Sequence, residues 1–221
     1  MKTVISARAV KHEVDTKSGL IKILEGVDLE LNIGESVAIQ GASGSGKSTL
    51  LSVLAGLDIP QEGRVIIDGC EITGLNEDER SNLRANKIGF VFQSFYLVDD
   101  LTALENVALP LELFGHKNAF QVASKWLGKL GMANRLKHFP KQLSGGEQQR
   151  VALCRAFAIN PKILFADEPT ANLDMVTAET VLEHLFALQK ELQTSMIIAT
   201  HDQTLAKRCD RVLYLQSGQL V

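Results

Sequence analysis

Residues 41–49 form a glycine-rich stretch with the pattern G-x-x-x-x-G-K-[ST]. An apolar run, Val37–Ile39, precedes it, and residues 49–54 continue it with the apolar spacing of a helix. Glycines let the backbone wrap closely around phosphate oxygens, and backbone N–H groups at the positive end of a helix attract the anion. The pattern therefore predicts a strand, a phosphate-binding loop and a helix rather than a flexible linker. The loop residues are Gly41, Ala42, Ser43, Gly44, Ser45, Gly46, Lys47, Ser48 and Thr49.

Four side chains are expected to act on a bound triphosphate. Lys47 can reach the β- and γ-phosphates, and Ser48 can place its hydroxyl on Mg²⁺. Asp167 and Glu168 follow the apolar run 163–166, and ligands of open α/β sheets bind at the carboxyl ends of such strands. Because successive strand residues point to opposite sides, we expect Asp167 to address Mg²⁺ and Glu168 to face a water in line with the γ-phosphate.

Composition favours a single soluble domain. The 221 residues are 45% hydrophobic and 22% charged, as in ordinary globular proteins. A formal net charge of −3 argues against a nucleic-acid partner. The sequence contains neither an apolar run long enough to span a bilayer nor a signal-peptide core. Cys70, Cys154 and Cys209 lie far apart, so we expect reduced, mostly buried cysteines and a cytoplasmic location.

Strand and helix patterns alternate along most of the chain. Apolar runs and apolar/polar alternation predict strands at 27–31, 37–39, 64–69, 88–92, 163–166, 196–200 and 212–215. Helical spacing predicts helices at 76–86, 104–109, 119–130 and 147–158, and one bearing Val181, Leu185, Leu188 and Leu192. This order indicates an α/β fold with a mainly parallel central sheet. The helix-rich stretch 94–158 is expected to be a subdomain inserted between the core segments 1–93 and 159–221.

The start of the helix predicted at 147–158 carries a second unusual stretch, Leu-Ser-Gly-Gly-Glu-Gln-Gln-Arg at 143–150. Ser144 and Glu147 have the spacing of a capping box, which alone would mean only a well-capped helix. Gly145 and Gly146 weaken a first helical turn, and their bare N–H groups at the positive helix end predict a second anion site. The inserted subdomain would hold this end away from its own phosphate loop. We therefore expect a head-to-tail homodimer with two-fold symmetry, in which each loop faces the helix end of the second copy.

Together these motifs resemble the ATP-binding subunit of ABC transporters. The resemblance covers essentially the full chain, with matches to Walker A (41–49), the Q-loop (Gln93), the signature (143–150), Walker B (164–168), the D-loop (171–174) and the H-loop (His201). More narrowly, residues 92–95, 104–107 and 143–155 are similar to the LolD/MacB/YbbA group, and most of all to YbbA-like subunits. The resemblance implies a P-loop NTPase core with an N-terminal antiparallel β subdomain and an inserted helical subdomain.

The resemblance also implies an ATPase that uses ATP and Mg²⁺ to drive an integral membrane permease, in envelope export or in lipoprotein or lipid extraction. Gln93 would sense Mg²⁺ and water, His201 would contact the γ-phosphate and support Glu168, and Asp174 would link the two sites of the dimer. Residues 95–97 (Phe-Tyr-Leu) fall where the family docks its permease. The subunit would then lie peripherally on the inner face of the cell membrane.

One position departs from the family pattern. The family usually places an aromatic residue near the end of the first strand to stack on adenine, and the alignment puts Val14 there. Stacking is worth about 1–3 kcal/mol per base, so its reduction would weaken nucleotide binding roughly tenfold and lower the preference for ATP over GTP.

Three other functions compete with the transport ATPase. A soluble ABC-type ATPase not coupled to transport is the main alternative, but those relatives carry long insertions that this chain lacks. A non-hydrolysing binding module would lack Glu168 or His201, and both are present. A P-loop kinase would have no use for residues 143–150.

Overall fold

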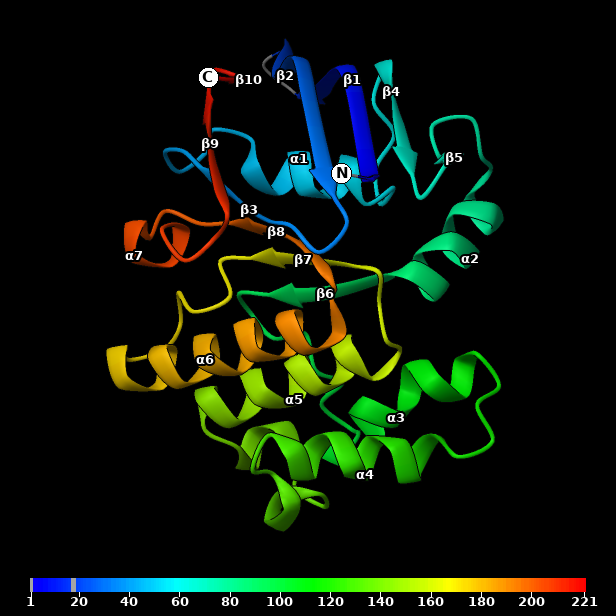
Figure 1. Ribbon diagram of the computed structural model, residues 1–221, viewed down its shortest axis with the longest axis vertical. Coiled ribbons are helices and arrows are strands. Elements are labelled where there is room, and N and C mark those ends of the chain that lie inside the picture. The colour runs from blue at the N-terminus through cyan, green and yellow to red at the C-terminus, as the bar shows by residue number, and fades with distance from the viewer. Residues whose placement is uncertain (1, 17–18) are drawn as a thin grey trace.

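Figure 1 shows the computed structural model of the protein, which describes residues 2–16 and 19–221. This part of the chain forms a four-stranded sheet with the order β2-β1-β4-β5 and a six-stranded sheet with the order β10-β9-β3-β8-β7-β6. The strands are β1 (Thr3–Thr16), β2 (Gly19–Asn32), β3 (Ser36–Gln40), β4 (Glu62–Ile67), β5 (Cys70–Glu71), β6 (Ile88–Phe92), β7 (Ile163–Asp167), β8 (Ser195–Ala199), β9 (Arg211–Gln216) and β10 (Gln219–Leu220).

The two sheets differ in strand direction. In the small sheet, β1 pairs antiparallel with β2 and β4, and β4 pairs antiparallel with β5. In the large sheet, β9, β3, β8, β7 and β6 run parallel, and β10 is an antiparallel edge strand. All residues of β3 and β8 are buried, which explains their continuous apolar runs, since parallel strands are covered on both faces. The predicted α/β fold with an N-terminal antiparallel subdomain is confirmed.

Helices cover both faces of the large sheet. In Figure 1, α1 lies between the two sheets, and α5 and α6 lie on the other side of the large sheet, with α4 beyond α5. None of the described helices combines the length and the hydrophobicity that a bilayer-spanning helix needs. The helices are α1 (Lys47–Leu54), α2 (Glu77–Lys87), α3 (Ala103–Leu113), α4 (Ala119–Lys129), α5 (Gly145–Ala158), α6 (Met175–Leu192) and α7 (Gln203–Ala206), with 3-10 turns at Ala133–Arg135 and Pro140–Gln142.

Side chains of the central strands alternate between two hydrophobic cores. On β7, Ile163 and Phe165 belong to the core that contains α1 and the small sheet. Leu164 and Ala166 belong to the core that contains α3, α4, α5 and α6. This alternation follows from the two-residue period of a strand. The helices between residues 94 and 158 therefore share one core with α6 and a face of the large sheet.

Asp68 connects three parts of the molecule. It lies in the turn between β4 and β5, and its Oδ2 is 2.7 Å from Lys87 Nζ, at the end of α2, and 2.7 Å from Lys162 Nζ, just before β7. Hydrogen bonds from Lys162 and then Lys87 lower the pKa of the Asp68 carboxyl to about 2. This carboxylate ties the small sheet to the large one.

Replacing Asp68 by asparagine is expected to lower the free energy of unfolding at pH 7 by about 1–2 kcal/mol, because the paired charge is lost. A carboxyl whose folded-state pKa is lowered stabilises the fold above its ordinary value of 3.8, and this contribution is lost as the pH falls toward 2. Urea unfolding of both proteins at pH 7 and at pH 3 measures the effect. A difference that stays the same at pH 3 would show that the ion pairs are not its cause.

Candidate active site

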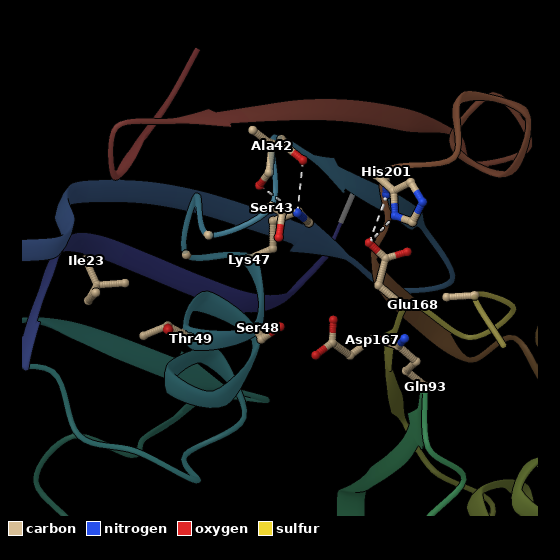
Figure 2. Close-up of a pocket in the computed structure, with 14 residues that line it drawn as sticks. Ile23, Ala42, Ser43, Lys47, Ser48, Thr49, Gln93, Asp167, Glu168 and His201 are labelled. Atoms are coloured by element: carbon tan, nitrogen blue, oxygen red, sulfur yellow. Dashed lines mark hydrogen bonds and ion pairs between the residues drawn. The ribbon is translucent and has the colours of Figure 1, made fainter.

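A cavity of about 700 Å³ lies at the carboxyl ends of four parallel strands. Its wall is formed by the phosphate loop after β3, Gln93 after β6, Asp167 and Glu168 at the end of β7, and His201 after β8 (Figure 2). These ends meet at one edge of the sheet because the strands run in the same direction. The loop contributes Gly41, Ala42, Ser43, Gly44, Gly46, Lys47, Ser48 and Thr49 to the wall. The structure thus brings the predicted phosphate, metal and hydrolytic residues together, without Ser45.

The phosphate loop is shaped by glycines and held by Lys47. Gly44 and Gly46 have φ angles of 77° and 97°, a backbone region that suits glycine. Helix α1 begins immediately after Gly46, so its N–H groups and dipole can attract an anion at the loop. Lys47 Nζ donates to the carbonyl oxygens of Gly41 at 2.9 Å and Ala42 at 3.1 Å. The lysine is therefore turned back over its own loop, as Figure 2 shows.

Glu168 is fixed by groups that follow β8. Its Oε1 lies 2.8 Å from His201 Nδ1 and accepts the His201 backbone N–H at 3.1 Å, while Oε2 accepts the Thr200 hydroxyl at 3.2 Å. Glu168 has a φ angle of 45°, and its backbone N–H donates to the carbonyl of Ala199 at 2.9 Å. The carboxylate is thereby held in one place on the cavity wall, where it can accept a proton from a water.

Three oxygen donors suited to Mg²⁺ line the cavity beside the loop. Asp167 Oδ1 is buried and has no hydrogen-bond partner in the described part of the chain. Burial raises the pKa of the Asp167 carboxyl; a hydrogen bond from Ser48 opposes this shift, and the charge of Glu168 adds to it. Figure 2 shows Asp167 between Ser48 and Gln93. A carboxylate, a hydroxyl and an amide oxygen are the hard ligands that Mg²⁺ prefers, so these residues fit the ion.

The second predicted anion site is the N-terminus of α5, and its residues do not line this cavity. Ser144, Gly145, Gly146, Glu147 and Asp174 are absent from the cavity wall. The predicted capping box is confirmed: Ser144 N–H donates to Glu147 Oε2 at 2.8 Å, and Glu147 N–H donates to Ser144 Oγ at 3.3 Å. Hydrogen bonds from Arg135 and from the Ser144 backbone lower the pKa of Glu147 to about 2. Asp174 caps α6 by accepting the Thr177 N–H at 3.1 Å.

The structure gives Gly146 a packing role that the sequence did not reveal. A Cβ atom on Gly146 would lie 2.1 Å from Thr177 Cγ2 on α6, whereas one on Gly145 would lie 3.3 Å from the nearest side-chain atom, of Leu173. From the sequence, bare N–H groups at the helix end were the expected reason for both glycines. For Gly146, close approach of α5 to α6 is a sufficient reason by itself.

Replacing Gly146 by alanine is expected to lower the free energy of unfolding by about 1–3 kcal/mol, because the new methyl group overlaps Thr177. The double variant Gly146→Ala/Thr177→Ser removes the methyl that it meets and should recover most of the loss. Urea unfolding of the single variants, including Gly145→Ala as a control, and of the double variant tests this. No recovery in the double variant would mean that the overlap is not the cause.

Val14 does not line the cavity. It pairs with Ile21 near the end of β1, and its side chain is 42% exposed. The large aliphatic side chain among the residues that line the cavity is instead Ile23 of β2. Sequence reasoning missed Ile23 because a register shift between β1 and β2 follows His12 and displaces the simple alternation there. It also missed Thr200 as a partner of Glu168, although a hydroxyl residue directly after a buried strand is a usable signal.

The fold and the cavity define a P-loop nucleoside triphosphatase. Residues 24–171 match the family model described as ABC transporter. With relatives at 44–49% identity over nearly the whole chain, the protein belongs to the ABC transporter ATP-binding family and is an ABC ATPase.

Two bacterial ATP-binding proteins are similar to the chain over almost its whole length. The chain is 49% identical to the uncharacterized ABC transporter ATP-binding protein YbbA of Escherichia coli strain K12, over 98% of this chain and 96% of that protein. It is 44% identical to the lipoprotein-releasing system ATP-binding protein LolD of Pseudomonas fluorescens, over 100% of this chain and 98% of that protein. Among solved structures it is similar to the ATP-binding cassette MJ0796, a dimer in a post-hydrolysis state with ADP and Pi, with a TM-score of 0.91, 40% identity and coverage of 98% and 96%.

Proposed function

We propose that the protein is the ATP-binding subunit of an ABC transporter that hydrolyses ATP with Mg²⁺ in a head-to-tail homodimer and drives an integral membrane permease. The observation that carries this proposal is the separation of two halves of one site. The cavity wall contains the phosphate loop, the oxygen donors and the Glu168–His201 pair, but not Ser144, Gly145 or Gly146 at the N-terminus of α5. The solved structure of MJ0796, a dimer bound to ADP and Pi, supports a dimeric ATPase here.

The mechanism assigns each side chain a step. The loop N–H groups and Lys47 hold the triphosphate. Glu168 accepts a proton from the attacking water while the water oxygen forms a bond to the γ-phosphorus. The bond from the γ-phosphorus to the bridging oxygen breaks, and ADP and phosphate are released. His201 keeps the Glu168 carboxylate in position and contacts the γ-phosphate.

Ser48, Asp167 and Gln93 would hold Mg²⁺, which when bound neutralises negative charge on the phosphate oxygens. The free N–H groups of Gly145 and Gly146 in the second copy, at the helix end where Ser144 and Glu147 form the capping box, would close over the same γ-phosphate. Asp174 would connect the two sites of the dimer, and residues 94–158 would act as the helical subdomain that carries the α5 end toward the second copy.

The dimer proposal is tested by dilution. ATP hydrolysis per subunit is expected to fall as the protein is diluted below the dimer dissociation constant, because an isolated subunit lacks the helix end that completes its site. Phosphate release is measured over a hundredfold range of protein concentration at saturating ATP and Mg²⁺. Hydrolysis that stays strictly proportional to protein concentration over this range would contradict the shared site.

The nucleobase would be held by aliphatic side chains, Ile23 on the cavity wall and Val14 near the end of β1. Changing Val14 to tyrosine is expected to tighten ATP binding about tenfold, because a ring adds stacking on adenine and the position is exposed enough to accept it. Equilibrium binding of ATP and GTP to both proteins measures this. Unchanged affinity for both nucleotides would show that other groups hold the base.

The permease proposal rests on two observations. Residues 95–97 follow Gln93, and the Tyr96 side chain is 65% exposed. The relative YbbA is described as an ABC transporter ATP-binding protein, and LolD as the ATP-binding protein of a lipoprotein-releasing system. These descriptions favour envelope export or extraction of lipoproteins or lipids, with the subunit on the inner face of the cell membrane.

Purification of the tagged protein from detergent-solubilised membranes should recover an integral membrane protein in stoichiometric amount. Its absence would favour an ABC ATPase not coupled to transport.

A further inference from the structure

The chain that follows Gln93 has an unusual backbone. Phe95 and Tyr96 have φ angles of 61° and 46°. Two consecutive residues with a Cβ atom in the left-handed region are unfavourable unless the surroundings hold them there. The segment between β6 and α3 therefore depends on contacts from other parts of the molecule.

Arg155 of α5 provides one of these contacts. Its Nη2 donates to the carbonyl oxygen of Phe95 at 2.7 Å, and its Nη1 donates to the carbonyl oxygen of Tyr96. Burial lowers the pKa of the Arg155 guanidinium, so its N–H groups need acceptors in place of water. The planar fork of arginine can bond both carbonyls of the bend at once, which a lysine ammonium on a flexible stem does less well.

Asn172 holds the same segment from the other side. Its Nδ2 donates to the carbonyl oxygen of Gln93 at 3.0 Å, and Gln93 Nε2 donates to Asn172 Oδ1 at 3.3 Å. With Nε2 engaged, Oε1 is the atom of the Gln93 amide that is left to coordinate a metal ion. Asn172 belongs to the stretch between Glu168 and α6, so this pair links two walls of the cavity.

We propose that Arg155 and Asn172 are positioning residues that hold Gln93 Oε1 at the Mg²⁺ site. This inference rests on the proposed function, in which Gln93 is a metal ligand. Arg155 fixes the bend at Phe95 and Tyr96. Asn172 fixes Gln93 itself, and neither side chain lines the cavity. Their effect on hydrolysis therefore passes through the orientation of one amide group.

The experiment combines Mn²⁺ binding with kinetics in Arg155→Lys, Asn172→Ala and Gln93→Ala. Mn²⁺ binding to the protein saturated with a non-hydrolysable ATP analogue is followed by electron paramagnetic resonance. Both positioning variants should weaken Mn²⁺ binding and lower kcat about tenfold, with the nucleotide Kd in the absence of metal unchanged. Arg84→Lys is the matched control. Arg84 lies on α2 and also donates to a backbone carbonyl oxygen, that of Gly56, so this variant should retain the unmodified Mn²⁺ affinity and kcat.

The decisive comparison is made in the Gln93→Ala background. There, Arg155→Lys and Asn172→Ala should have no further effect on Mn²⁺ affinity, because the group that they position is gone. A loss that adds fully to that of Gln93→Ala, or unchanged Mn²⁺ binding in both single variants, would overturn the inference. Failure of the proposed function is distinguishable, since it would appear as an unmodified protein that hydrolyses no ATP or as a Gln93→Ala variant that binds Mn²⁺ normally.

Discussion

Replacing Glu168 by glutamine is expected to lower kcat for ATP hydrolysis at least a hundredfold, which corresponds to about 2.7 kcal/mol in the activation barrier. The amide has nearly the same shape as the carboxylate, but it cannot accept the proton of the attacking water. It also loses the charge that His201 Nδ1 faces at 2.8 Å. Phosphate release at saturating ATP measures the effect, and ATP binding should persist.

The variant should also accumulate as an ATP-bound dimer, because hydrolysis no longer occurs to open the closed dimer. Size-exclusion chromatography with ATP and Mg²⁺ would detect this dimer. Glu191→Gln is a matched control. Glu191 lies exposed near the end of α6 and pairs with Lys129 at the end of α4, so loss of the Glu191 charge should leave kcat unchanged. Turnover at the unmodified rate in Glu168→Gln would mean that another group acts as the base.

Replacing Lys47 by alanine is expected to weaken ATP binding at least about a hundredfold. The Lys47 ammonium would place a positive charge beside the phosphates, and it donates hydrogen bonds to the carbonyl oxygens of Gly41 and Ala42. Its removal therefore weakens the attraction for the phosphates and also removes the hydrogen bonds that shape the loop. Titration calorimetry with ATP in the presence and absence of Mg²⁺ measures the affinity. Lys117→Ala, on an exposed turn before α4, is the control, and unchanged binding in Lys47→Ala would remove the loop from its assigned role.

Much of the architecture could be predicted because it follows local rules. The runs at 88–92 and 163–166 are buried strands because parallel strands are covered on both sides. The capping box of Ser144 with Glu147 depends on residues only three apart, and it is present. The cavity residues could be grouped because the carboxyl ends of parallel strands converge.

What could not be predicted depends on contacts between distant residues. The apolar/polar alternation predicts a strand at 27–31, whereas β2 spans Gly19–Asn32 and forms a long ribbon with β1. Register shifts in that ribbon interrupt the two-residue alternation, which hid its length and the position of Ile23. The contact of Gly146 with Thr177 and the hold of Arg155 on the Gln93 segment join residues tens of positions apart. Such pairs leave no pattern in a single sequence.

The most direct measurement mixes two inactive proteins, Lys47→Ala and Ser144→Arg. Suppose that each triphosphate lies between the loop of one subunit and the α5 end of the other. In an equal mixture, half of all dimers then pair one copy of each variant, and each of these heterodimers contains one intact site. An equal mixture should then hydrolyse ATP at about a quarter of the unmodified rate, far above either variant alone. A mixture no more active than the sum of its two components would contradict the shared site.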